Sequence, residues 1–192
     1  FQNEFRKENK NSSLITDFSL TKGYKSSVNN KEKNINHIFL KYNQDLILPE
    51  YISSDLNLKI ERVSNDTYLK VFDSNLVQSP VMPNSKDTLT SELNLDLEHQ
   101  NYNFTSKFQV FESLGKKHSD RYQYILPSYS FSRNIDIKNI DGLLNFYSSW
   151  ENNLKDTNNL RTSVVNDFEY SSINYFTQYG LKNNFNLYFK NL

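Results

Sequence analysis

The chain has 192 residues with 22 basic and 22 acidic side chains, so its formal net charge at pH 7 is zero. Such a balance gives no long-range attraction to nucleic acid, and we expect no nucleic-acid partner. The absence of cysteine excludes disulfides and thiolate metal sites within these residues. The absence of alanine, the strongest helix former, argues against a helical protein, and no stretch is apolar enough for a helical membrane span.

Apolar and polar residues alternate along most of the chain, which is typical of β-strands with two different faces. The first ten residues are charged, and we expect a frayed or partial strand there. Together with the hairpin described next, the pattern predicts about eight to ten strands in an all-β, antiparallel up-and-down meander. The other alternating segments are 13–21, 34–43, 54–63, 67–72, 122–133, 143–151, 160–170, 173–179 and 181–190. Both faces of 34–43 are partly apolar, so its inward face stays ambiguous.

The clearest pattern lies in residues 88–111. Two alternating runs, each about ten residues long, are joined by His99, Gln100 and Asn101, which predicts a β-hairpin. One face would be leucine- and phenylalanine-rich, and the other would carry amides and charges. Strands of this length and pattern are typical of a membrane barrel with lipid outside and water inside. A soluble sheet with one wet face gives the same pattern, so both alternatives stay open here.

Prolines mark two irregular places. Pro80 and Pro83 lie in segment 73–87, which we expect to be a long loop. Pro127 interrupts an alternating run, and because proline cannot donate to a strand ladder, it marks a strand end, a bulge or a locally open pairing.

The sequence contains no recognisable catalytic constellation, and we expect no enzyme, no metal and no cofactor. The three histidines are far apart in the sequence and lack partners at ligand spacing. We expect His99 and His118 to be solvent-exposed, and His37 to face a pore or the surface. The four glycines form no phosphate-binding loop.

Several segments, in order, resemble the barrel domain of the LptD family, the lipopolysaccharide-assembly or organic solvent tolerance proteins of the Gram-negative outer membrane. A strand leads into Val63-Ser64-Asn65-Asp66-Thr67-Tyr68-Leu69, and a strand reading Phe-Gln-Val-Phe follows at 108–111. A Leu-Pro segment at Leu126-Pro127 comes next, then residues 157–162. The resemblance covers roughly residues 35–190.

The resemblance implies that residues 1–192 are a fragment of an outer-membrane β-barrel domain, a partial arc without the periplasmic N-terminal domain and the remaining strands. The family's barrel has about 26 strands, whereas small barrels start at about 8. The implied function is to assemble lipopolysaccharide into the outer leaflet. The implied partners are lipopolysaccharide, outer-membrane lipid, a plug lipoprotein (LptE-like) and periplasmic bridge proteins.

Two sets of residues are candidates for functional or structural roles. A set of polar side chains on the hairpin could line an aqueous lumen, although an ordinary wet sheet face is the alternative: Asn94, Asp96, Glu98, Lys107 and Gln109. The residues of the family-like motifs are expected to be structural: Ser64, Asp66, Tyr68, Leu69 and Pro127. We expect Asp66 to cap a turn through its carboxylate, and Tyr68 to anchor at an interface with a wet hydroxyl.

Two rival functions remain. One is a different outer-membrane barrel, such as a porin or receptor, which would have a full-length gene without the upstream periplasmic domain. The other is a soluble β-sandwich that serves as a binding module, in which the apolar parity would be buried between two stacked layers. The sequence does not give strand orientation, the strands of the lateral seam, or the lipopolysaccharide chemistry.

Overall fold

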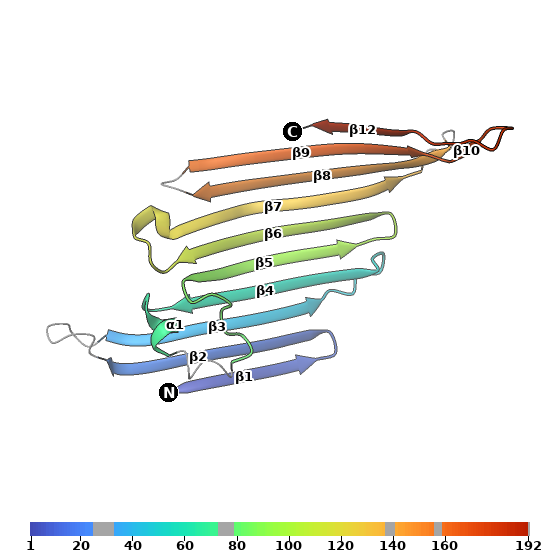
Figure 1. Ribbon diagram of the computed structural model, residues 1–192. Coiled ribbons are helices and arrows are strands. Elements are labelled where there is room, and N and C mark those ends of the chain that lie inside the picture. Colours follow the sequence, from blue (N-terminus) through green and yellow to red (C-terminus); the bar gives the residue numbers. More distant parts are fainter. Residues whose placement is uncertain (25–32, 73–78, 137–140, 156–158, 192) are drawn as a thin grey trace.

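The computed structural model describes residues 1–24, 33–72, 79–136, 141–155 and 159–191. It confirms the expected all-β class, since 70% of residues are in strands and 4% in helices. Ten strands form one antiparallel sheet whose order follows the chain, except that the last strand, β12, lies beside β9 (Figure 1). The sheet is a meander that does not close into a barrel.

The strands of the large sheet are mostly long. They are β1 (Gln2–Asn9), β2 (Ser12–Tyr24), β3 (Lys33–Asp45), β4 (Ser53–Val63), β5 (Thr88–Glu98), β6 (Tyr102–Ser113), β7 (Tyr122–Ile135), β8 (Gly142–Lys155), β9 (Asn159–Ser172) and β12 (Asn186–Asn191). Two short strands, β10 (Tyr175–Phe176) and β11 (Lys182–Asn183), pair with each other. A short helix α1 (Tyr68–Val71) and a 3₁₀ turn η1 (His118–Arg121) lie in the connections. No helix in the described ranges is long and apolar enough to cross a membrane.

Most predicted strands are confirmed, and they run longer than the sequence indicated. The N-terminal residues form a full strand, because β1 pairs with β2 continuously from Gln2 opposite Ser19 to Asn9 opposite Ser12. The central hairpin is confirmed as β5 and β6, with Leu93 opposite Phe108. In its turn, the His99 amide donates to the Tyr102 carbonyl at 2.9 Å.

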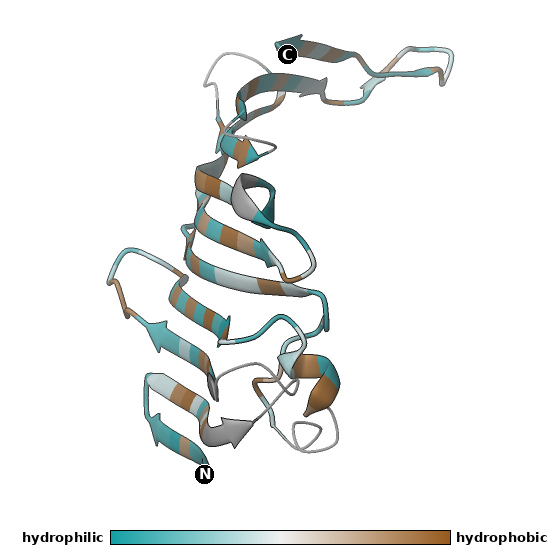
Figure 2. Cartoon of the chain, turned by 90° about the vertical axis from the view of Figure 1, so that its left-hand side faces the viewer, coloured by the Kyte–Doolittle hydropathy of each residue, from teal (hydrophilic) through white to brown (hydrophobic). Residues whose placement is uncertain are grey.

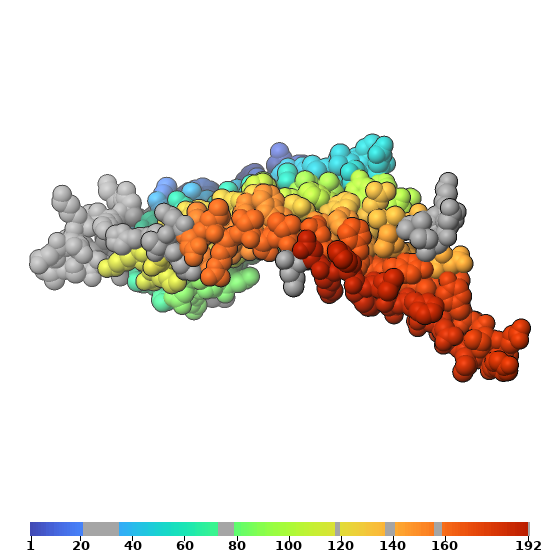
Figure 3. Space-filling view, turned by 90° about the horizontal axis from the view of Figure 1, so that it is seen from above, coloured from blue at the N-terminus to red at the C-terminus, as the bar shows by residue number. Residues whose placement is uncertain are grey.

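Three predicted strands differ from the structure. Residues 67–72 contain α1 instead of a strand. The helix follows a turn in which the Asn65 side chain accepts from the Thr67 amide at 2.9 Å. Residues 173–179 contain only the two-residue strand β10, and residues 181–190 contain β11 and most of β12 instead of one continuous strand. The β10–β11 hairpin interrupts them, and it protrudes beyond the sheet at the red end of the chain (Figure 3).

Pro127 lies in a β-bulge, one of the three alternatives that the sequence left open. From Ile125 to Ser128, β7 advances three residues, while β6 advances two from Gln109 to Lys107 and β8 two from Asn153 to Glu151. The extra residue explains the change of parity in this segment, because an inserted residue shifts later side chains to the other face of a regular strand. Tyr124 and Tyr129 therefore point to the same face despite their odd separation.

Hydrophobic and hydrophilic residues alternate along the strands, visible as brown and teal bands in Figure 2, and this alternation gives the sheet an apolar and a polar face. Figure 2 also shows that the connection between β4 and β5 packs on one side of the sheet. The described part of this connection, residues 64–72 and 79–87, is called the covering segment below. Residues 73–78, the first part of the predicted 73–87 loop, lie outside the described residues.

Candidate functional site

The five predicted lumen-facing side chains share one face of the β5–β6 hairpin. Asn94 is directly opposite Lys107, and Gln109 donates to the Glu92 carboxylate at 2.9 Å. Asp96 accepts a hydrogen bond from Thr105 at 2.9 Å. Glu98 lies at the end of β5 on the same face and accepts from the Ser53 hydroxyl at 3.3 Å, so the hairpin presents a continuous polar surface. That this surface lines a lumen stays a prediction.

The opposite face of the sheet is apolar, and no second layer covers it among the described residues. Leu93 and Phe108 are 38% and 44% exposed although they are neighbours in the centre of the sheet. Other exposed side chains of this face lie on strands far apart in the order: Leu20, Ile38, Val164 and Phe168. A single-layer sheet with an uncovered apolar face differs from a sandwich, in which that face is the core.

The covering segment packs on the polar face, above β2 to β4. A small hydrophobic cluster joins it to the sheet, and each of its central members is at most 7% exposed. The cluster consists of Ile35, Phe39, Tyr68, Leu69, Val81, Leu89 and Leu114. The otherwise polar face is therefore locally apolar where the segment lies. This accounts for the two partly apolar faces of residues 34–43, which the sequence left ambiguous.

A buried polar network lies beside this cluster and holds Tyr68. Its hydroxyl is 2.6 Å from Ser19 Oγ and 2.7 Å from His37 Nδ1, and these two atoms are 3.1 Å apart. On the other side of the imidazole, Nε2 lies 3.2 Å from Asp17 Oδ1, but the two groups are not aligned as a hydrogen bond. Gln2 donates its amide to both Asp17 oxygens. All members but Gln2 are at most 5% exposed.

This network corrects two expectations. His37 does not face a pore or the surface, because it is 1% exposed and its ring stacks on Phe39 at a centroid distance of 4.4 Å. The hydroxyl of Tyr68 is not wet, because it is bonded inside the network. Burial raises the pKa of Tyr68, and the nearby Asp17 charge adds to this effect, while the bond from Ser19 opposes it.

Sequence reasoning missed Asp17 and Ser19, although both stand out as polar residues on the same face as the apolar Ile15. A Ser, a His and an Asp in contact suggest comparison with a hydrolase triad. The comparison fails on access, because Ser19 is 5% exposed and the Tyr68 hydroxyl occupies the position beside its Oγ. We interpret the network as a structural attachment for the covering segment.

A second attachment is formed by Arg121 at the end of η1. Its Nη2 lies 2.7 Å from Asp66 Oδ1 and 2.7 Å from Glu112 Oε1, and its Nε donates to the same Glu112 oxygen at 2.8 Å. The hydrogen bond to Asp66 is the largest cause of a raised pKa of Arg121. Burial lowers this pKa, and the contacts with Glu112 raise it further. Asp66 therefore does not cap the turn as expected. The Asn65 side chain stabilises that turn through the Thr67 amide, and Asp66 ties the covering segment to the connection between β6 and β7.

The structure also shows where most of the other residues singled out in the sequence lie. Ser64 Oγ accepts from the Asn36 amide at 2.8 Å, and Leu69 is 1% exposed in the cluster. His99 is only half-buried and stacks on Tyr102 at 4.6 Å, while the side chain of His118 lies outside the described residues. No group of three His, Cys, Asp or Glu side chains that could hold a metal ion occurs in the described part of the chain.

Comparisons with known proteins return no match: no family model, no curated protein and no solved structure is significantly similar to this chain.

Proposed function

We propose that this chain is part of an outer-membrane β-barrel that transports lipopolysaccharide into the outer leaflet of a Gram-negative bacterium. In this proposal the apolar face meets lipid, and the polar face, with Asn94, Asp96, Glu98, Lys107 and Gln109, lines an aqueous lumen. The observation that carries the proposal is the uncovered apolar face of a single-layer sheet. A soluble sandwich module would bury the same side chains between two layers.

Strand length supports the membrane part of the proposal. Strands β4 and β5 have 11 residues, and β7, β8 and β9 have 14. A tilted strand needs about 9 to 11 residues to cross the hydrocarbon layer, so each of these strands is long enough. Antiparallel pairing of neighbours also satisfies the backbone groups inside the sheet, which a lipid environment requires.

The lipopolysaccharide part rests on the resemblance of the ordered segments around Tyr68, Phe108 and Pro127 to the LptD family. Lipopolysaccharide has acyl chains and an anionic sugar head. A wide polar lumen holds the head in water while the chains pass sideways through a weak strand seam into the membrane. No bond is made or broken, and the energy comes from outside the barrel through periplasmic partners.

The experiment places a photo-reactive amino acid on either face of the full-length protein in living cells. Asn94 and Lys107 represent the polar face, and Leu93 and Phe108 are matched positions on the apolar face of the same hairpin. We expect the polar positions to capture lipopolysaccharide and the apolar positions to capture phospholipid. A protein that fractionates away from the outer membrane, or polar positions that capture no lipopolysaccharide, would refute the proposal. The second result, in an outer-membrane protein, would favour a diffusion channel or receptor.

A further inference from the structure

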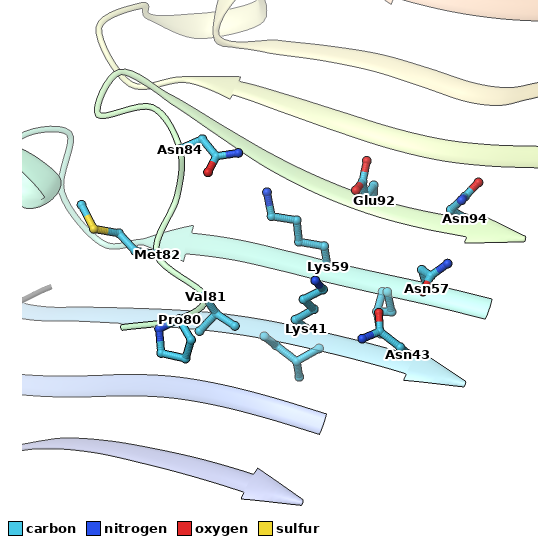
Figure 4. A pocket seen from close by; sticks show the side chains of 12 residues that line it. Lys41, Asn43, Asn57, Lys59, Pro80, Val81, Met82, Asn84, Glu92 and Asn94 are labelled. Carbon is cyan, nitrogen blue, oxygen red and sulfur yellow. The ribbon is translucent and has the colours of Figure 1, made fainter. Parts of the chain in front are cut away.

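A pocket of about 420 Å³ lies on the polar face over β3, β4 and β5, beside the part of the covering segment that leads into β5 (Figure 4). Strand side chains, among them Lys41, Asn43, Asn57 and Lys59, form one wall, and Val81 and Met82 of the covering segment form another. Its volume falls within the range of about 300–1,000 Å³ that is usual for small-molecule sites. The covering segment thus leaves a hollow over polar strands instead of packing on them fully.

Two lysines line the pocket, and one of them has no ion-pair partner in the described part of the chain. Lys41 and Lys59 are directly opposite in the β3–β4 register, an arrangement that costs stability because like charges face each other. Lys59 is neutralised by Glu61 at 2.6 Å. Lys41 has no ion-pair partner within the described ranges. The remaining carboxylate of the pocket, Glu92, lies directly opposite Lys59 in the β4–β5 register and accepts a hydrogen bond from the Gln109 amide.

The surroundings of Lys41 combine amides with an apolar wall. Asn43 and Asn57 are directly opposite each other, two residues along the strands from the lysine pair, and the Asn43 amide donates to Ser13 at 3.1 Å. Amides both donate and accept hydrogen bonds, as recognition of sugar hydroxyls requires. An ammonium group binds a phosphate or carboxylate as a point charge. On the covering segment, Val81 and the partly buried Met82 add apolar groups to the lining, against which the carbon–hydrogen face of a ring can pack.

We propose that this pocket binds an anionic saccharide, with Lys41 paired to the phosphate or carboxylate and the two asparagines bonded to ring hydroxyls. The inference deepens the proposed function and rests on it, because it names the part of the ligand that stops at this place on the polar face. The same chemistry occurs in a free sugar phosphate and in a lipid-linked sugar head.

The test measures calorimetric binding to the full-length protein in detergent micelles. The probes are glucose 6-phosphate, glucose, inorganic phosphate and, for the lipid-linked source, lipopolysaccharide in the same micelles. The variants are Lys41→Gln, Lys41→Arg as a charge-preserving change, and Lys155→Gln as a matched control on the uncovered polar face of β8. Lys41 is exposed, so its replacement is not expected to prevent folding.

We expect glucose 6-phosphate to bind more tightly than glucose or inorganic phosphate, and Lys41→Gln to weaken this binding at least about tenfold, the effect of losing one charge-assisted contact. Lys41→Arg and Lys155→Gln should bind like the unaltered protein. Competition by lipopolysaccharide would assign the site to the lipid-linked head, and its absence to a free sugar phosphate. Equal affinity for inorganic phosphate and glucose 6-phosphate, an unaffected Lys41→Gln variant, or no binding at all would overturn the inference.

Failure of this inference can be told from failure of the proposed function. If the protein binds sugar phosphate but the polar face gives no lipopolysaccharide cross-links, the saccharide site is supported and the transport function is refuted. If Asn94 and Lys107 give lipopolysaccharide cross-links but the protein binds no sugar phosphate, the transport function is supported and the saccharide site is refuted.

Discussion

Replacing Tyr68 with phenylalanine should release the covering segment from the sheet. The change removes one hydroxyl and keeps the ring that packs in the cluster, so only the bonds to Ser19 and His37 are lost. A buried hydrogen bond contributes about 1 kcal/mol, and a partner left unsatisfied costs about 1–3 kcal/mol. Because Ser19 Oγ and His37 Nδ1 are 3.1 Å apart, they can bond each other after the change. We therefore expect the free energy of opening of the covering segment to fall by about 1–2 kcal/mol. This corresponds to a rise of about 5- to 30-fold in the population in which the segment is detached.

Native-state hydrogen exchange in the full-length protein measures this opening directly. The reporter amides are those of Val71, which donates to the Thr67 carbonyl at 3.0 Å, and Phe72, which donates to the Tyr68 carbonyl at 3.0 Å. Their exchange should accelerate by the factor given above, and amides in the centre of β8 should not change. The matched control is Tyr188→Phe, since Tyr188 is 61% exposed on β12. Acceleration below twofold in the Tyr68 variant would refute the attachment that we describe.

The same attachment should weaken in alkali. The pKa of Tyr68 is raised above its ordinary value of 10.0 in the folded protein, so the folded state keeps the phenol proton more tightly than the unfolded state. The stabilisation is complete below pH 10 and is lost as the pH rises through the folded-state pKa. After correction for the intrinsic exchange rate, the amides of Val71 and Phe72 exchange more slowly in the unaltered protein than in Tyr68→Phe. This difference in protection should become smaller above pH 10. A constant difference would contradict this assignment.

Three further changes test other parts of the structure. Arg121→Ala should lower the free energy of opening of the covering segment by about 1–3 kcal/mol, because it leaves the nearly buried carboxylate of Glu112 without its main partner. Proteolysis within residues 64–87 should therefore accelerate. Deletion of Pro127 should be tolerated, because it removes the extra residue of the bulge. Deletion of Ser130 should abolish folding, because it moves the side chains of the rest of β7 to the opposite face of the sheet. Heat denaturation of the two variants distinguishes these outcomes. In lipid vesicles, Leu93→Lys should destabilise the folded protein by about 2–4 kcal/mol and Asn94→Lys by much less, as measured by denaturant titration, and equal effects would contradict a lipid-facing apolar side.

The sheet could be predicted from the sequence because strand periodicity is local. Alternation over ten residues gives both the strand and its faces, and the three-residue turn at 99–101 fixes the register of the central hairpin. The bulge was one of the three alternatives that Pro127 indicated, because proline cannot donate to a strand ladder. The polar set at Asn94 and Lys107 could be placed on one face for the same reason.

The attachment of the covering segment could not be predicted, because it depends on contacts between residues distant in sequence. Ser19 and Tyr68 are 49 positions apart, and Asp66 and Arg121 are 55 positions apart. A six-residue alternation at 67–72 is too short to distinguish a strand from a helical turn. The visible sign was the mixture of His37 with apolar neighbours on a face that should be polar, which indicates that something packs there.

The covering segment also has a consequence for cooperativity. Among the described residues, strands of the large sheet make substantial contacts only with their neighbours. The sheet therefore resembles a one-dimensional array in which each strand pairing adds its own contribution to stability. Such an array frays from its ends. By linking β2 with the connection that follows β6, the segment couples strands that do not touch, so the first six strands should unfold as one unit while β9 and β12 open separately.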